Sequence, residues 1–291
     1  MLRRSNKTAL ALAKNFFFGN FGLTLLAVAI FALLYMLGNL FLPIGIILIF
    51  GMLILFYSAL FYYSKQIPTI DSPEQMEEVA LSTTLGKLFF DRIAEGTALF
   101  LAVLTALAIF SIISYLVLTA MIGSEIDTLQ SLAAQLEQSD DPQQIELYFG
   151  QLMQLLFSPM LIIFLIGSFF AYVSIGVYGR MLKGEGFLEV YRRYFLLFWP
   201  KYWLGTFRWS YFLLVSGWMI IAFLITFVAY ILFYIIFLGI GFALQQHPGA
   251  MVVLLALIGT LFNQLLSYFI GLYTAAVSIF ADDIASGEVD G

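Results

Sequence analysis

The chain alternates between long apolar runs and shorter polar stretches. Six runs contain no Lys, Arg, Asp or Glu: residues 20–38, 42–63, 97–122, 157–178, 209–238 and 250–281. A helix needs about 20 apolar residues to cross roughly 30 Å of hydrocarbon. The pattern therefore predicts an all-α fold, a polytopic membrane helical bundle with six transmembrane helices in a single membrane domain.

The first two runs are separated only by Asn39–Pro43, a segment that Pro43 helps to turn. A single continuous helix is the alternative interpretation. It would contain about 44 residues and measure about 66 Å, which is too long for one crossing. We therefore expect a tight hairpin of two spans.

Basic residues predict the orientation of the bundle. With six spans, all 13 Lys and Arg residues fall on one side: Arg3, Arg4, Lys7, Lys14, Lys65, Lys87, Arg92, Arg180, Lys183, Arg192, Arg193, Lys201 and Arg208. The opposite side carries only acids, namely Glu125, Asp127, Glu137, Asp140, Asp141 and Glu146. Positive charge accumulates in cytoplasmic loops. We expect a protein of the cell inner (plasma) membrane with its N-terminus and C-terminus cytoplasmic.

The acidic segment 124–156 is predicted to form an outer helical hairpin over the mouth of the bundle. Ser124 is a candidate N-cap, and Asp141-Pro142 offers a second cap with proline at the first helical position. Apolar residues recur at helical spacing in both halves: Leu129, Leu132, Leu136, Ile145, Phe149, Leu152 and Leu156. An unstructured acidic loop is the alternative.

The basic side is predicted to carry helices that lie in the membrane interface. The N-terminal segment 1–19 should lie along the membrane surface with its leucines and phenylalanines. Ser72-Pro73-Glu74-Gln75 matches a capping box, and a second short helix is expected from Ser82. Residues 187–199 combine aromatic and basic side chains, as expected in the headgroup layer. The acidic tail 282–291 is predicted to be solvated and disordered.

A basic–any–aromatic–Phe pattern occurs three times. It comprises Lys14-Asn15-Phe16-Phe17, Lys87-Leu88-Phe89-Phe90 and Arg192-Arg193-Tyr194-Phe195, each ahead of an odd-numbered span. Three repeated units would explain the spacing, and so would the general enrichment of such residues at membrane interfaces.

With tyrosines near the inner ends of the even spans (Tyr57, Tyr172 and Tyr273), this layout resembles bacterial six-span inner-membrane families of poorly defined function. These are the YciC-like proteins and the membrane domain that accompanies some glycerophosphodiester phosphodiesterases. The resemblance implies no catalytic residues.

The composition excludes several kinds of metal and redox site. The chain is 62% hydrophobic and 11% charged, with no cysteine and one histidine, His247. Disulfides, iron–sulfur clusters and thiolate or paired-histidine metal sites are therefore excluded. We predict no catalytic residues, no metal site and no cofactor. Glu95 and Asp91 are expected to be solvated below the third span, and Asp282-Asp283 lacks the further acids of an aspartate-rich pyrophosphate site.

One face of the sixth span is polar or small over most of its length. Thr260, Asn263, Gln264, Ser267, Gly271, Thr274 and Ser278 lie close to one line at about 100° per residue. This face predicts either helix packing or the wall of a hydrated path or ligand pocket. For packing, the expected partners of the two amides are Ser111, Ser114, Ser168 or Thr226.

These features favour a non-enzymatic scaffold or accessory factor in envelope or lipid-related processes. The alternative is a transporter or channel for a neutral or lipid-like substrate, lined by the polar face of the sixth span. An enzyme ranks third. Expected partners are membrane lipids, together with other envelope proteins or a second copy of the chain, and no nucleic acid.

Overall fold

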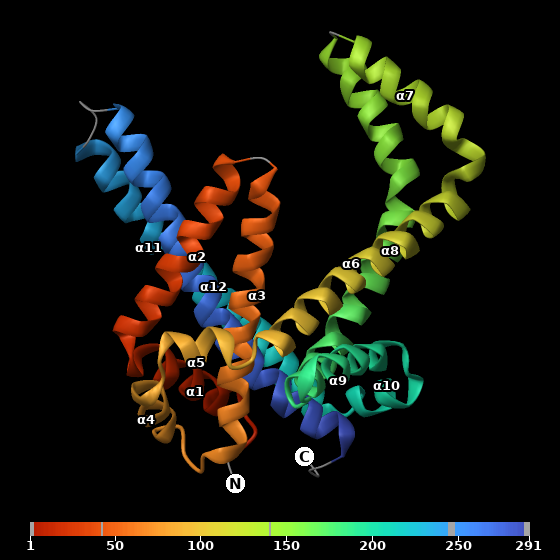
Figure 1. Ribbon diagram of the computed structural model, residues 1–291. Helices are drawn as coiled ribbons and strands as arrows, with labels where there is room; N and C mark the ends of the chain where they lie inside the picture. Colours follow the sequence, from red (N-terminus) through yellow and green to blue (C-terminus); the bar gives the residue numbers. More distant parts are fainter. Residues whose placement is uncertain (1–2, 42, 140, 244–247, 288–291) are drawn as a thin grey trace. The chain divides into compact units, whose positions relative to one another are not determined.

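The computed structural model describes residues 3–41, 43–139, 141–243 and 248–287, and within these ranges every regular element is helical. The long helices are α2 (Phe21–Leu40), α3 (Ile44–Gln66), α6 (Ile93–Ile122), α8 (Pro142–Leu182), α11 (Trp209–Ala243) and α12 (Pro248–Ser286). The shorter helices are α1 (Asn6–Gly19), η1 (Ile67–Thr69), α4 (Gln75–Ser82), α5 (Leu85–Phe90), η2 (Gly123–Glu125), α7 (Ile126–Gln138), α9 (Gly186–Arg193), η3 (Tyr194–Phe198) and α10 (Pro200–Thr206). Figure 1 follows them along the chain.

The prediction of an all-α fold with six spans is confirmed. Six helices in the described part of the chain are long and apolar enough to cross a membrane. The largest difference from the expected limits is in α8, which begins at Pro142 instead of residue 157. Helices α11 and α12 end at Ala243 and Ser286 instead of 238 and 281, and the other limits differ by at most a few residues. Pro159 lies inside α8 and does not start it. His247 lies outside the described residues.

The chain divides into two compact units. Unit 1 combines Met1–Ala102 with Val173–Gly291, and unit 2 is Val103–Tyr172. Helix α6 leaves unit 1 after Ala102, and α8 returns to it at Val173.

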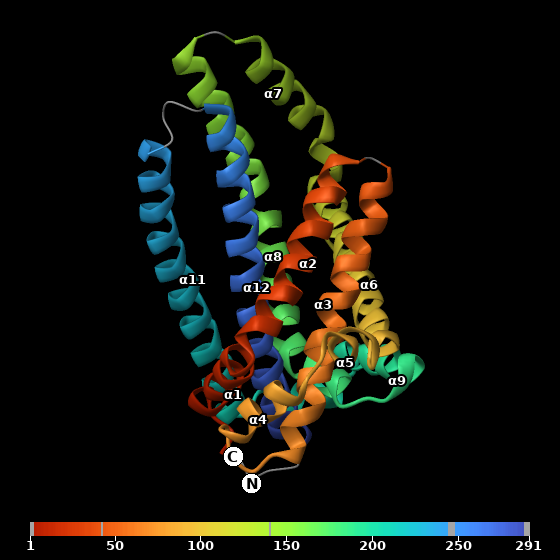
Figure 2. The same ribbon diagram turned by 60° about the vertical axis from the view of Figure 1, so that its left-hand side comes forward.

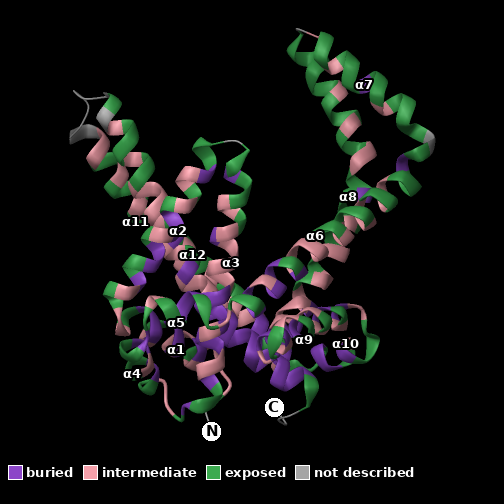
Figure 3. Ribbon diagram, in the orientation of Figure 1, coloured by how far each residue is buried: buried purple, intermediate pink, exposed green. Residues whose placement is uncertain are grey.

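Unit 1 is held together at the end where most of its basic residues lie, here called the basic end. Buried residues gather there, around α1 and the last turns of α12 (Figure 3). An aromatic cluster extends the core toward the α2–α3 hairpin, with Phe31 contacting Phe56 and Tyr268 at centroid distances of 5.7 and 5.9 Å. The hairpin itself confirms the predicted turn between the first two spans.

Helix α1 forms as predicted in segment 1–19, and the Ser5 hydroxyl accepts the amide of Thr8 at its N-terminus. Its apolar face, however, is part of the protein core. Leu12, Phe16 and Phe17 are buried, and α1 packs on α4 and α12. The prediction that these apolar residues lie along the membrane surface is therefore wrong for this face, because α4 and α12 pack against it. Figure 2 shows α1 beside α4 and the end of α12.

The short helices after α3 follow their sequence signals in part. The Gln75 side chain accepts the backbone amides of Asp71 and Ser72 at 2.7 and 3.4 Å, which is one half of the predicted capping box. The next helix, α5, begins at Leu85 with Thr84 as its N-cap, so the expected start at Ser82 is wrong. Ser82 instead ends α4.

Unit 2 contains the rest of α6, then α7 and most of α8. The predicted helical hairpin at residues 124–156 is helical on both sides, but its second side is the beginning of α8 and not a separate helix. Asp141 caps α8 by accepting the amide of Gln143, whereas α7 has Glu125 at its N-cap without a side-chain bond. The placement of the 124–156 hairpin over the bundle stays a prediction. Asp140 lies outside the described residues.

Candidate functional site

The polar face of α12 has two parts with different surroundings. Gly271, Thr274 and Ser278 lie toward the basic end and are used for helix contacts. The Thr274 hydroxyl accepts the indole N–H of Trp218 at 3.1 Å and donates to the Ile270 carbonyl. Ser278 is fully buried, and the side chains of Phe56 and Leu60 cover Gly271.

The other part of this face is more open. Asn263 and Ser267 are exposed, and the Asn263 carbonyl oxygen accepts the Tyr230 hydroxyl at 2.9 Å. The Thr260 hydroxyl donates to the Ala256 carbonyl of its own helix. Gln264, in contrast, is buried at 7% exposure. The partner of Asn263 is thus a tyrosine of the adjacent span, not one of the expected serines or threonines.

The buried part of the polar face of α12 therefore packs helices together.

A cavity of about 10 Å³ lies beside Tyr268, Thr24 and Asn20, which is room for about one water molecule.

A cluster of charges at the end of α12 was not predicted. The fully buried Asp282 carboxylate pairs with Arg180 at 3.1 Å and with Lys183 at 2.8 Å. The Tyr202 hydroxyl donates a hydrogen bond of 3.0 Å to the same carboxylate. These partners come from the end of α8, the following loop and α10, so Asp282 joins three segments to α12.

Asp283 extends the cluster to the N-terminus of the chain. Its carboxylate pairs with the Arg4 guanidinium at 2.5 Å and with the Lys183 ammonium. Arg208 adds a bond of 2.7 Å to the Ile284 carbonyl. Cations are favourable at the C-terminal end of a helix, where the unpaired carbonyls concentrate negative charge. This end of α12 therefore attracts basic residues by both its carboxylates and its backbone.

The electrostatics of the cluster favour the protonated forms of Lys183 and Tyr202. Burial alone disfavours the Lys183 ammonium, but Asp282 and Asp283 outweigh it, and the pKa of Lys183 is raised. Burial, followed by the charge of Asp282, raises the pKa of Tyr202. At neutral pH the lysine stays charged and the phenol stays protonated. The two carboxylates are occupied by the protein's own cations, an arrangement that favours holding helices together over binding a metal or moving protons.

The surroundings of the acidic residues correct two predictions. Residues 282–286 are the last turns of α12 and not a solvated tail, because the buried carboxylates find partners there. Residues 288–291 lie outside the described residues. Glu95 is likewise buried instead of solvated, paired with Arg92 at 3.2 Å and accepting the amide of Gly186 at 3.2 Å.

Two glycines allow α8 and α10 to approach α12 closely beside the charge cluster. A side chain at Gly179 would overlap the Ser278 carbonyl of α12, and one at Gly205 would overlap the Ala285 carbonyl. Both glycines therefore bring the backbones of α8 and α10 into direct contact with α12, next to the charged groups. In the sequence, Gly179 directly precedes Arg180, and Gly205 lies three positions after Tyr202.

No family model, curated protein or solved structure matches this chain.

Proposed function

We propose that the protein is a non-enzymatic scaffold or accessory factor of a bacterial-type inner membrane, with both termini in the cytoplasm, acting in envelope or lipid-related processes. The observation that carries the proposal is a helical surface in unit 2, defined as the acidic arm: α7 and residues 142–156 of α8. This surface is both apolar and acidic. Its part in α8 belongs to a helix that is longer than one membrane crossing requires.

The length of α8 supports this assignment. Its 41 residues would measure about 60 Å at 1.5 Å per residue, whereas the hydrocarbon layer is about 30 Å thick. About half of the helix is therefore available outside the membrane. This excess lies at the end joined to α7.

The chemistry of the acidic arm favours a protein partner. Its exposed large apolar side chains are Ile126, Ile145, Leu147, Phe149 and Met153. Its acids are Asp127, Glu137 and Glu146, with Asp141 directly before α8, and the sequence has no Lys or Arg between Arg92 and Arg180. Contiguous apolar side chains on a water-exposed helix are typical of an interaction surface. Negative charge disfavours an anionic lipid surface, so the complementary partner is an envelope protein with a basic and apolar face.

The charged groups of unit 1 support a role without catalysis. Asp282, Asp283 and Glu95 are each paired with cations of the same chain. An active site would need a nucleophile, an acid–base pair or a metal within reach of a substrate. The groups with the most unusual surroundings are instead used to join helices.

The alternative, a transporter or channel, is favoured by one observation. Asn263 and Ser267 are exposed although they lie in a span, where polar side chains usually avoid lipid. A hydrated path for a neutral or lipid-like substrate would account for that exposure.

Photocrosslinking in intact cells tests the scaffold. Benzoylphenylalanine in place of Phe149, which is 54% exposed, should give a crosslinked product of discrete protein mass. The same residue in place of Phe223, exposed on α11, is the control and should give no such product. Absence of a protein adduct at Phe149, or equal adducts at both positions, would contradict the proposal. An adduct of twice the chain's mass would identify self-association.

A further inference from the structure

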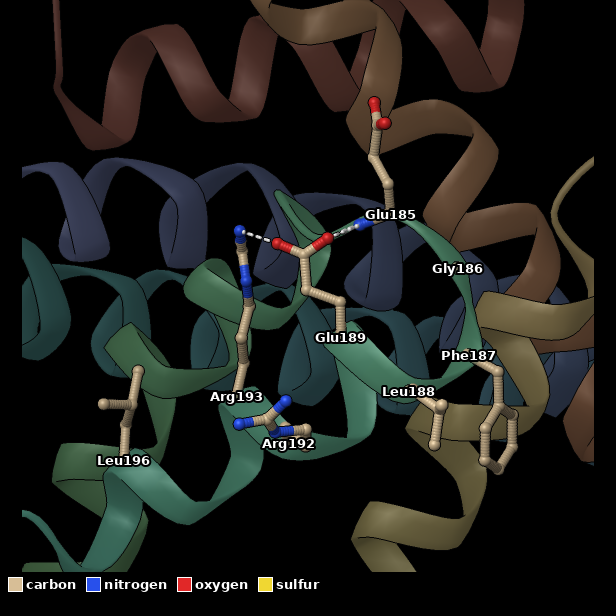
Figure 4. A pocket seen from close by; sticks show the side chains of 8 residues that line it. All are labelled: Glu185, Gly186, Phe187, Leu188, Glu189, Arg192, Arg193 and Leu196. Carbon is tan, nitrogen blue, oxygen red and sulfur yellow. Dashed lines mark hydrogen bonds and ion pairs between the residues drawn. The ribbon is translucent and has the colours of Figure 1, made fainter.

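Helix α9 borders an open groove of about 850 Å³ at the basic end of unit 1. The groove is lined by apolar side chains, among them Phe187, Leu188 and Leu196, together with the charged residues of α9. Figure 4 shows Glu189 between Arg193 and the backbone nitrogen of Glu185, with Arg192 beside them. Its volume falls in the range of small-ligand sites, about 300–1,000 Å³.

Four charged residues line this groove: the acids Glu185 and Glu189, and the arginines Arg192 and Arg193. Glu189 pairs with Arg193 and accepts the amide of Glu185; that amide, followed by the charge of Arg193, lowers the pKa of Glu189. Glu185 lies 3.9 Å from the Lys65 ammonium. No carboxylate in the described part of the chain pairs with Arg192, which is exposed. Because Glu189 pairs with Arg193, and Glu185 with Lys65 outside the lining, the Arg192 guanidinium is left available to an anionic ligand.

The surroundings of the groove are those of a membrane surface. Residues 183–208 connect α8 to α11, two helices long and apolar enough to cross a membrane, so both ends of the segment are tied to the ends of these spans. Large apolar side chains along it and at the start of α11 are exposed, up to 72% at Leu188: Leu188, Phe195, Trp199, Leu204, Phe207 and Trp209. Tryptophan and phenylalanine beside exposed cations are typical of a segment that lies among lipid headgroups.

We infer that the α9 groove binds the headgroup of an anionic phospholipid, with the Arg192 guanidinium on its phosphodiester and Phe187, Leu188 and Leu196 against the upper acyl chain. Guanidinium and phosphate form charge-assisted hydrogen bonds in a matched planar geometry. The exposed apolar residues favour a lipid over a soluble phosphate, because a free ion would leave them in water. The inference depends on the membrane-crossing helices and not on the scaffold proposal, so each can fail without the other.

Lipid titration of the full-length protein in a neutral detergent tests the site. Phosphatidylglycerol and phosphatidylcholine are added separately, and bound lipid is counted by native mass spectrometry. The expected result is preferential retention of phosphatidylglycerol. Arg192→Gln should weaken it about fivefold, the usual effect of one cation at an anionic surface, while Arg192→Lys should recover part of the loss.

The matched control is Lys87→Gln. Lys87 is an exposed cation in the same basic–any–aromatic–Phe pattern, and it lies outside the α9 groove. An equal loss in both variants, or no loss in Arg192→Gln, would overturn the inference. Displacement of the lipid by millimolar inorganic phosphate would also overturn it, because the site would then select the ion and not the lipid.

Discussion

Arg4 and Asp283 are 279 positions apart in the sequence, yet their side chains pair at 2.5 Å. Lys183 contacts Asp283 as well as Asp282, so this contact joins the start of the chain, the loop after α8 and the end of α12. Side chains from both ends of the sequence therefore hold the helices together at the basic end of unit 1.

Asp283→Asn should lower the stability of unit 1. Removing one partner of a buried ion pair leaves the other charge uncompensated, at a typical cost of about 3–5 kcal/mol. Arg4 remains partly solvated at 16% side-chain exposure, so we expect the lower end of that range. Thermal unfolding in detergent measures the effect, with Glu78→Gln as the control because Glu78 is exposed. Equal midpoints for both variants would show that the cluster carries no stability.

Gly179→Ala should also destabilise the protein, for a steric reason. The added methyl group would overlap the Ser278 carbonyl, and because that atom is backbone, α8 and α12 must move apart. Overpacking of this kind typically costs about 1–3 kcal/mol. Gly51→Ala is the matched control, since nothing lies within 4 Å of a side chain there. An unchanged midpoint for Gly179→Ala would contradict the close approach of α8 and α12.

Local patterns in the sequence were sufficient for the spans and most of the short helices. Uninterrupted apolar runs gave six crossings, and the Asp141-Pro142 cap gave the start of a helix. The same cap was assigned to a hairpin helix separate from the fourth span, because the uncharged run that marks that span begins only at residue 157. The structure has one continuous helix with Pro159 inside it. Proline lacks a backbone N–H, so Pro159 removes only one of the many backbone hydrogen bonds of α8.

The charge cluster could not be predicted, because its partners are distant in sequence. Hydropathy falls at Asp282, which looks like the end of a span followed by a tail. Whether a carboxylate is solvated or buried depends on the cations that the fold brings to it, here Arg180 and Lys183, about 100 positions away. The polar face of α12 was predictable from helical spacing, but its partners Trp218 and Tyr230 are aromatic residues, which the pattern alone assigns to lipid contact.

The protein should lose stability at alkaline pH through Lys183. Its pKa is raised in the folded protein above the ordinary value of 10.5, because the folded state favours the charged ammonium. Below pH 10.5 both the folded and unfolded states keep the proton, and the stabilisation is complete. Above it the unfolded state loses the proton first, and the stabilisation disappears as the pH rises through the folded pKa.

Unfolding midpoints between pH 8 and 11.5 measure this loss. Tyr202 acts in the same direction, because its raised pKa also favours the protonated folded state. Lys183→Arg is therefore the informative comparison: arginine stays charged throughout this range, and the tyrosine is unchanged. We expect a smaller alkaline decline in Lys183→Arg than in the unchanged protein. Identical declines would mean that Lys183 does not contribute.

Single cysteines can separate the two interpretations of the α12 face, because the chain has no cysteine of its own. Asn263→Cys should remain unlabelled by a membrane-impermeant maleimide if lipid and helices surround that face, since a thiol reacts only where water and reagent reach it. A hydrated path would expose it, and labelling from either side of the membrane would favour the transporter.

Two further positions calibrate that experiment and test the orientation. Gln138→Cys, at the end of α7, should react in intact spheroplasts, and Glu78→Cys, on α4, should react only after permeabilisation. Under a six-span arrangement, Gln138 lies between the third and fourth crossings and Glu78 between the second and third, so they must lie on opposite sides. Labelling of both from the same side would contradict six crossings, and labelling in reverse would place the acidic arm in the cytoplasm, where an envelope partner could not reach it.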